Sequence, residues 1–457
     1  MSQETGLAPG TVARAYRMLR DRGLLRAGVG QGTFVSDRSG PALAPRRLSG
    51  DGPAEIAGRH ARAALTSRWL FEARANDGIQ LMGGYGDVGK ALAQGLIARI
   101  GERGIASAAA IATLHPADGA AEARNAIADR FTRLMGRHVT GEELVLSHGA
   151  HALLDMALRA MTRPGDTILT EHPTYYGALD LFEAHGLDVV PIARTPRGLD
   201  LAALEHACRT RSPRLFYFTG SPSTPCGHVL EEGEARDLLA LVKKWHLPTI
   251  EDSALWPFRF DGRPLPPLYA QDDSALVIHI CSLSKWFFPS LRFAVALGTS
   301  RSFARLRLVN RGVTRISSVY PQFAVADYLA SSAFETDFRS SVAAYAEACD
   351  ALLAGLHRHL PGRLRPEAPR GGFSVWIELP SRLAPERLYG QCMREGVYPL
   401  IGRIFTLKSE EVTGLRLAFG QNPPARLEEA SRRLGTALRL VLRDGAETAP
   451  PPPEALV

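Results

Sequence analysis

The chain has 457 residues, of which 45% are hydrophobic and 22% are charged. That length can bury the core of one large globular unit and carry a small appendage. The formal net charge is +7, and residues 1–47 hold eight Arg against three acidic residues. Positive charge therefore gathers at one end of the chain, as a phosphate-contacting surface requires, and DNA becomes a candidate partner.

The five cysteines lie far apart, and the sequence has neither a C-x-x-C pair nor a His cluster at metal-ligand spacing. We therefore expect no disulfide, no metal site and a reduced, cytoplasmic environment. No apolar run approaches the roughly 18 residues of a membrane span, and the N-terminus lacks the apolar core of a signal peptide. We expect no membrane partner.

Residues 9–22 place apolar side chains at positions i, i+3, i+4 and i+7, which predicts a helix with one apolar stripe and a basic outer face. Residues 28–35 have the Gly-rich turn and β-branched run of a small hairpin, or wing. The pair predicts a helix in the major groove and a wing on the DNA backbone or minor groove, although a solvated basic helix is the alternative. The candidate DNA-binding residues are Thr11, Arg14, Arg17, Arg26 and Gln31.

Beyond this segment the pattern changes twice. Residues 37–75 are rich in Ala, Arg, Gly and Pro, which is typical of a linker. From about residue 76 strand and helix signals alternate, which predicts an α/β fold with a mostly parallel sheet. The expected strands are 144–146, 167–170, 189–192, 215–218, 249–251, 277–280 and 293–297.

Helical signals dominate after residue 292 to about 360, and short strand signals follow at 373–379 and 415–419. A smaller C-terminal α+β lobe is therefore expected. The predicted domains are a partial winged helix-turn-helix at 1–36, a linker at 37–75, a domain at 76–442 with lobes at about 105–320 and 321–442, and a disordered tail at 443–457.

The most informative stretch is Ser282-Leu-Ser-Lys285-Trp-Phe-Phe-Pro-Ser-Leu-Arg292, which follows the apolar run 275–280. Lysine is rarely buried, yet Lys285 lies between apolar segments, and burial lowers the pKa of an amine and favours imine formation with an aldehyde. Ser282, Ser284 and Arg292 can hold a phosphate nearby. A phosphate-bearing aldehyde is what pyridoxal 5'-phosphate (PLP) offers, so PLP is the candidate cofactor and Lys285 the candidate catalytic residue.

Other strand ends supply candidate cofactor contacts, because open parallel sheets bind ligands there. Gly149, Ala150 and His151 begin a helix whose free N–H groups can bind a phosphate, although capping alone explains such a start. Tyr175 can stack on a planar ring or simply pack under its loop. Asp252 ends a buried strand, where it either caps the next segment or pairs with a protonated pyridine nitrogen.

Arg416 lies inside a short apolar strand near the C-terminus. A buried guanidinium should face a carboxylate. That carboxylate belongs either to a structural Asp or Glu or to a bound amino acid, and the sequence leaves both open.

In chain order, five segments resemble the fold-type I aminotransferase family over roughly residues 76–442: Glu171-His-Pro-Thr-Tyr175, Ile250-Glu-Asp252, Ser282-Leu-Ser-Lys285, Pro289-Ser-Leu-Arg292 and Leu415-Arg416-Leu. With the N-terminal segment, the whole chain resembles the MocR branch of the GntR regulators, in which a winged helix-turn-helix precedes an aminotransferase-like domain. The resemblance implies a head-to-tail homodimer with the cofactor near the subunit interface.

The same resemblance implies the roles of single residues. Lys285 would form the Schiff base with the cofactor, and Asp252 would pair with its pyridine nitrogen. Tyr175 would be the stacking ring, and Arg416 would hold a ligand carboxylate. The implied phosphate site consists of Gly149, Ala150, Ser282, Ser284 and Arg292.

Three departures from the family pattern bear on activity. The Tyr expected shortly after Asp252 is missing from Asp252-Ser-Ala-Leu255. The Asn or Gln side chain that the family pattern has before Pro-Thr-Gly is absent here. Only Ser223 or Thr224 could replace its amide as a hydrogen-bonding group. Bulky residues follow Lys285 where smaller ones are common. We expect PLP to bind and transamination to be weak or absent, because donors to the cofactor's phenolic oxygen tune proton transfer.

The DNA-binding segment also departs from its family, since only about seven residues precede the predicted helix. Its three-helix core is expected to be incomplete, which leaves the apolar stripe of the helix uncovered. We expect either that the true start of the protein lies upstream or that the chain is a natural truncation with weakened DNA binding. The leading hypothesis is a PLP-binding transcription regulator modulated by PLP and an amino acid or amine effector. The alternatives are an aminotransferase acting on an amino acid and a 2-oxo acid, and a degenerate scaffold without cofactor.

Overall fold

The computed structural model describes residues 8–21, 25–28, 32–35, 78–83, 90–106, 113–195, 198–262, 265–362, 364–380, 385–407 and 414–447. The chain forms two compact units, Met1–Ala61 and Arg62–Val457. The predicted linker at 37–75 lies outside the described residues, as does the tail from residue 448 onward.

The described residues of the first unit form one helix and one hairpin. Helix α2 (Pro9–Asp21) begins with a proline, whose fixed φ suits the first helical position. The antiparallel strands β1 (Leu25–Gly28) and β2 (Gly32–Val35) follow. No residue of α2 is buried within the described part, and Leu19, from the predicted apolar stripe, is 38% exposed. The outward residues Thr11, Arg14 and Arg17 are all exposed.

The second unit is built on an eight-stranded sheet in the order β4-β11-β10-β9-β8-β5-β6-β7. Strands β10, β9, β8, β5 and β6 run parallel, while β11 is antiparallel to both of its neighbours and β7 is antiparallel to β6. All seven predicted strands are present in it. The bounds of the eight strands are β4 (Leu144–Ser147), β5 (Thr167–His172), β6 (Asp188–Thr195), β7 (Gly198–Leu199), β8 (Leu215–Phe218), β9 (Thr249–Asp252), β10 (Val277–Ser282) and β11 (Ala294–Leu297), of which β7 was not predicted.

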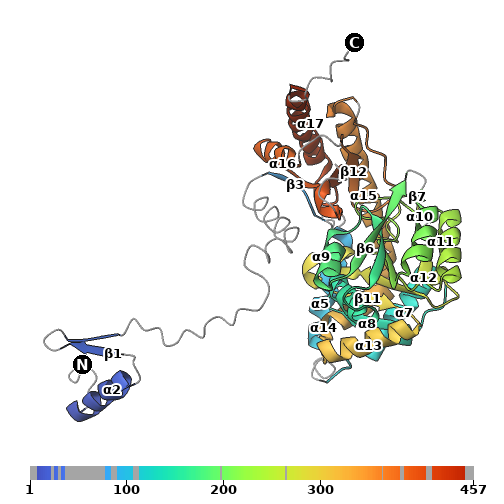
Figure 1. The fold of residues 1–457 in the computed structure, drawn as a ribbon. Coiled ribbons are helices and arrows are strands. Elements are labelled where there is room, and N and C mark those ends of the chain that lie inside the picture. Colours follow the sequence, from blue (N-terminus) through green and yellow to red (C-terminus); the bar gives the residue numbers. More distant parts are fainter. Residues whose placement is uncertain are drawn as a thin grey trace. The chain divides into compact units, whose positions relative to one another are not determined.

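Helices cover both faces of this sheet (Figure 1). Because side chains alternate along a strand, neighbouring residues enter opposite cores: Tyr217 packs with α8, α9 and α13, whereas Phe216 and Phe218 pack on the other side. The first layer comprises α8 (Ala150–Met161), α9 (Tyr176–Ala184) and α13 (Arg301–Thr314). The opposite layer includes α7 (Ala121–Met135), α10 (Leu201–Arg211), α11 (Glu232–Lys244), α12 (Leu268–Gln271) and α14 (Tyr320–Ala330), with α5 (Lys90–Ala106) packed against α14.

A smaller sheet has the order β12-β14-β13-β3. Strand β3 comes from the start of the unit and pairs in parallel with β13, a long-range contact that no local pattern indicates. Helix α17 packs on α15 and continues to Glu447. Residues 443–447 are therefore helical, whereas the sequence predicted that the disordered tail begins at residue 443. The helix is held in place by the buried apolar side chains of Leu434, Leu438 and Val441. The bounds are β3 (Ile79–Leu81), β12 (Ser374–Glu378), β13 (Val397–Ile401), β14 (Gly414–Ala418), α15 (Ser332–His359), α16 (Pro385–Arg394) and α17 (Pro424–Glu447).

In the described part of the chain, short 3-10 turns lie at four loops: η1 (Gly141–Glu143), η2 (Leu283–Lys285), η3 (Pro289–Leu291) and η4 (Gly402–Phe405). The predicted α/β class, with a large mostly parallel lobe and a smaller α+β part, is confirmed. No described helix is both long enough and apolar enough to cross a membrane.

Candidate cofactor site

The parallel strands β5, β8, β9 and β10 end along one edge of the large sheet, and the loops after them surround a cavity of about 210 Å³. Strand β4 ends at the same edge, because it is antiparallel to β11 as β11 is to β10. The small sheet contributes through β13 and β14. Nine of the residues predicted from the sequence line this cavity: Ala150, His151, Tyr175, Thr224, Asp252, Ser282, Lys285, Arg292 and Arg416.

Lys285 lies in η2, directly after the buried strand β10. The pKa of its amine is lowered to about 8: desolvation by burial is the main cause, the charge of Arg416 acts in the same direction, and Asp252 opposes them. The next residue, Trp286, is buried, and its indole N–H donates a hydrogen bond of 2.9 Å to the Ala254 carbonyl. Trp286, one of the bulky residues that follow Lys285, therefore joins the Lys285 loop to the loop after Asp252 by a hydrogen bond.

Asp252 is the last residue of β9, and it lines the cavity. Desolvation raises the pKa of its carboxyl to about 6, although the hydroxyl of Tyr217, which donates to Oδ2 at 2.9 Å, lowers it. Oδ1 has no hydrogen-bond partner among the described residues. At pH 7 the carboxylate is therefore mostly ionised and keeps one oxygen for a cationic ring nitrogen.

The N-terminus of α8 and Arg292 form another end of the cavity. Gly149 precedes the helix at φ 121°, a conformation that favours glycine, and a Cβ there would lie 2.7 Å from Nη2 of Arg292. The first N–H groups of α8, at Ala150 and His151, have no partner within the helix. With the Ser282 hydroxyl they form a cradle whose donors fit a phosphate. Desolvation lowers the pKa of His151, so its imidazole is neutral at pH 7.

Arg416 lies in β14 and is 6% exposed. Its Nη1 donates to the Met82 carbonyl at 3.3 Å, while its Nε has no hydrogen-bond partner among the described residues. Burial lowers the pKa of the guanidinium to about 10, and the groups that oppose this effect are Tyr176 and Tyr175. No carboxylate of the described residues pairs with Arg416. The structural Asp or Glu that the sequence left open is therefore not found there.

The three sequence departures have clear positions. Leu255 lines the cavity and brings a hydrocarbon side chain where the family pattern has a Tyr. Ser223 does not line it, because its Oγ accepts a hydrogen bond from the His228 amide at 3.1 Å. Thr224 does line it, and its hydroxyl has no hydrogen-bond partner in the described part of the chain. Tyr175 also borders the cavity, with its ring centroid 5.0 Å from that of Tyr176.

Two predicted residues do not line the cavity. Gly149 acts through its backbone, as described above. Ser284 lies outside because its Oγ accepts a hydrogen bond of 2.8 Å from the Phe293 amide. Arg26 lies in β1 and Gln31 lies outside the described residues, so the wing contacts stay predictions.

Sequence reasoning assigned no site role to eight other lining residues. Some are neighbours of predicted residues, and their strand-end positions could have indicated them. Met82, Leu400 and Phe405 come from segments that meet only through the small sheet, so no local signal pointed to them. The eight are Met82, Tyr176, Thr219, Pro222, Ala254, Leu255, Leu400 and Phe405.

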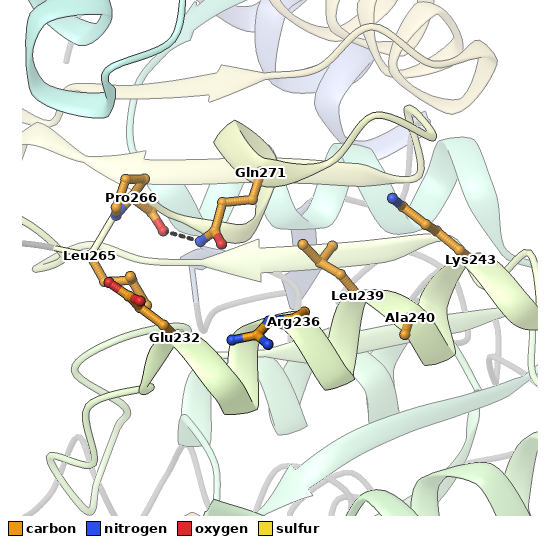
Figure 2. A pocket seen from close by; sticks show the side chains of 8 residues that line it. All are labelled: Glu232, Arg236, Leu239, Ala240, Lys243, Leu265, Pro266 and Gln271. Carbon is orange, nitrogen blue, oxygen red and sulfur yellow. Dashed lines mark hydrogen bonds between the residues drawn. The ribbon is translucent and has the colours of Figure 1, made fainter.

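A larger hollow of about 550 Å³ is lined by α11 and by the segment from Leu265 to Gln271, whose side chains Figure 2 shows. Its lining combines exposed charged side chains of both signs, such as Glu232 and Arg236, with Leu239 and Pro266. The hydrogen bond drawn there joins Gln271 to the Pro266 carbonyl at 2.7 Å. None of the described residues with strongly shifted pKa values lies in it, so the smaller cavity is the better candidate for the cofactor site.

Comparison with known proteins identifies the family of the chain. The model of the family described as aminotransferase class I and II matches residues 85–434. The uncharacterized HTH-type transcriptional regulator YdcR of Escherichia coli is 30% identical over 325 residues, covering 70% of this chain and 68% of YdcR. The probable rhizopine catabolism regulatory protein MocR of Rhizobium meliloti is 26% identical over 450 residues, covering 98% of this chain and 89% of MocR.

Among solved structures, LysN of Thermus thermophilus, an α-aminoadipate aminotransferase complexed with N-(5'-phosphopyridoxyl)-L-leucine, is 27% identical with a TM-score of 0.75. The match covers 83% of this chain and 95% of LysN. The chain therefore belongs to the aminotransferase class I and II family. The predicted resemblance to MocR-type regulators is confirmed by relatives of that kind.

Pyridoxal 5'-phosphate is the cofactor of this protein, and the residues present fit it. When bound, it supplies an electron sink that stabilises negative charge on a carbon next to nitrogen. The Lys285 amine can hold its aldehyde, the free Oδ1 of Asp252 can accept from its ring nitrogen, and the cradle at Gly149 and Arg292 can hold its phosphate. Tyr175 can cover the ring.

Proposed function

We propose that this protein is a transcription regulator in which the first unit binds DNA and the PLP-binding domain senses an amino acid or amine. The observation that carries this proposal is the match to MocR over 98% of the chain, which includes helix α2 and its hairpin. The exposed basic face of α2 and a cavity lined by the candidate cofactor residues in the same chain support it. A homodimer in the cytoplasm suits both roles.

On the DNA side, α2 would enter the major groove with Thr11 and Arg14 near base edges, while Arg17, Arg26 and Gln31 complete the contact. The exposed side chains of the helix support this assignment. Replacing an arginine that contacts a phosphate should weaken binding to all sequences and reduce the salt slope by about one. Arg14→Ala should instead relax sequence preference, since base contacts carry specificity.

On the ligand side, the chemistry of the cavity favours binding over turnover. Leu255 can donate no hydrogen bond to the cofactor's phenolic oxygen, and the Thr224 hydroxyl is the donor that remains in place of the family's amide. Weaker control of that oxygen leaves proton transfer poorly tuned. Transaminase activity should therefore be weak or absent, while the cofactor is still held.

A true aminotransferase is the second candidate, because Lys285, Asp252, Arg292 and Arg416 all line one cavity. In that case the Lys285 amine would move the α-proton of an amino acid and Arg416 would hold its carboxylate. Mixing the holoprotein with a panel of amino acids separates the two. Conversion of the bound cofactor to its amine form within seconds favours the enzyme, and a stable spectrum favours the sensor.

The experiment that tests regulation measures binding to DNA from around the protein's own gene, with and without PLP, for the wild type and for Lys285→Ala. Regulation requires the ligand to bind two arrangements of the protein with different affinities, so PLP should change the DNA dissociation constant of the wild type. The same addition should leave Lys285→Ala much less affected. Equal DNA affinity in all four samples would refute the proposal.

A further inference from the structure

The carboxyl group of Asp252 has a tyrosine behind it. Asp252 ends β9 and lines the cavity, whereas Tyr217 lies in the neighbouring strand β8 and does not line the cavity. Tyr217 stands opposite Ile250 in the register of the two strands. Since side chains alternate along a strand, Tyr217, Ile250 and Asp252 project from one face of the sheet. Tyr217 is therefore the diagonal neighbour of Asp252 and reaches it from the core.

The contact between them is a hydrogen bond of 2.9 Å from the Tyr217 hydroxyl to Oδ2 of Asp252. Tyr217 is fully buried, and its ring packs edge-to-face on Phe182 of α9 with the centroids 5.4 Å apart. Burial, the charge of Asp252 and the hydrogen bond all raise the pKa of Tyr217 well above its ordinary value, so the hydroxyl keeps its proton. A fixed donor on Oδ2 sets the orientation of the carboxylate and turns its other oxygen to a second donor.

The same hydrogen bond favours the charged form of Asp252. Burial raises the pKa of the carboxyl to about 6. Of the effects that lower this pKa, the hydrogen bond from Tyr217 is the largest, ahead of the charges of His279 and Lys285. A hydrogen bond to a charged group is strong enough to shift such an ionisation by roughly one to two pH units. The other titratable groups that act on or respond to Asp252 are Glu171, Tyr175 and Cys281.

We propose that Tyr217 is a positioning residue for the cofactor: its hydroxyl holds Asp252 as an oriented carboxylate that receives the protonated ring nitrogen of PLP. Tyr217 acts through Asp252, because it lies outside the cavity. Without the hydroxyl, the buried carboxyl would carry a proton over a wider pH range and would have no charge to offer the ring nitrogen. The inference rests on the assignment of Asp252 to that nitrogen, and it holds for a regulator and for an enzyme alike.

Fluorescence titration of the apoprotein with PLP between pH 5.5 and 8.5 tests the proposal on the wild type and Tyr217→Phe. The ratio of the two dissociation constants at one pH cancels the ionisation of free PLP. Since the ionised carboxylate is the form that binds, the variant must lose a proton over more of this range. From a midpoint near 6 and a shift of one to two units, Tyr217→Phe should bind PLP about 10- to 70-fold more weakly at pH 5.5 and within about twofold of the wild type at pH 8.5.

Tyr328→Phe is the matched control. Tyr328 is also a buried tyrosine whose hydroxyl donates to a carboxylate, Oδ2 of Asp337 at 2.6 Å, and it does not line the cavity. Its replacement should lower stability in urea unfolding and leave the affinity for PLP within about twofold of the wild type at every pH. If Tyr217→Phe loses affinity equally at pH 5.5 and 8.5, or not at all, the tyrosine only packs and the proposal is overturned.

A second pair of variants keeps the test decisive if Tyr217→Phe does not fold. Asp252→Asn should weaken PLP binding at pH 8.5 by about tenfold or more, because the charge for the ring nitrogen is lost. The double variant Tyr217→Phe/Asp252→Asn leaves no unpaired buried carboxyl, and it should bind PLP within about twofold of Asp252→Asn at every pH. A double variant that binds more weakly than this, or an Asp252→Asn variant that binds as tightly as the wild type at pH 8.5, would contradict the proposal.

Discussion

The rate at which PLP attaches to the apoprotein should follow the ionisation of Lys285. Only a neutral amine attacks an aldehyde. With a pKa of about 8, about one Lys285 side chain in ten is neutral at pH 7, against about one in three thousand for a lysine with a pKa of 10.5. At pH 7 the site should therefore react about 300-fold faster than an exposed lysine of equal intrinsic reactivity.

Stopped-flow absorbance after mixing apoprotein with PLP measures this rate. It should rise about tenfold per pH unit below 8 and level off above it. The series should start above about pH 6.5, because Asp252 takes up a proton near pH 6 and would add its own dependence.

Two variants should move the midpoint of this profile in opposite directions. Arg416→Met removes a positive charge that lowers the pKa of Lys285, so the midpoint should rise. Asp252→Asn removes a negative charge that raises it, so the midpoint should fall, each by roughly half to one pH unit. A wild-type midpoint near 10, or shifts of the same sign in both variants, would refute the electrostatic account of this lysine.

Three further substitutions test other parts of the site. Gly149→Ala should weaken cofactor binding by about 1–3 kcal/mol, because the backbone φ at this position is strained for alanine and the added Cβ would meet Arg292. Fluorescence titration of the apoprotein with PLP measures this affinity, and an unchanged affinity would contradict the assignment of the phosphate cradle. Lys285→Met should stabilise the apoprotein at pH 7 by up to about 3 kcal/mol in urea unfolding, since the folded-state pKa lies below the unfolded value. That gain is complete below pH 8 and should vanish by about pH 10.5, so a pH-independent gain would point to packing instead. Trp286→Phe should cost about 1 kcal/mol in the same assay through the lost hydrogen bond to the Ala254 carbonyl, and no loss would mean that this bond is dispensable.

Much of the fold followed from local sequence patterns. The strand signals of the large sheet are short apolar runs bounded by turns, and the strands formed there because both faces of the sheet are covered by helices. Lys285, Asp252 and Tyr175 could be placed at one edge because parallel strands bring their carboxyl ends together. Strand-end positions therefore predicted correctly that these three residues line one cavity.

Other features depend on long-range packing that spacing does not encode. Strand β3 joins β13 across more than three hundred residues, and this contact brings Met82 next to Arg416. Ser284 looked like a phosphate contact because it precedes Lys285, but its hydroxyl is taken by the Phe293 amide. The partner of Asp252, Tyr217, lies on a neighbouring strand and became evident only from the register of the sheet.

Covalent engagement of one amine by the cofactor is the claim on which the sensor and the enzyme proposals both depend. Borohydride reduction of the purified protein, followed by proteolysis and mass spectrometry, tests it directly. The account predicts a reduced phosphopyridoxyl group on the peptide that contains Lys285 and on no other peptide. An unmodified Lys285 in protein saturated with PLP would contradict it.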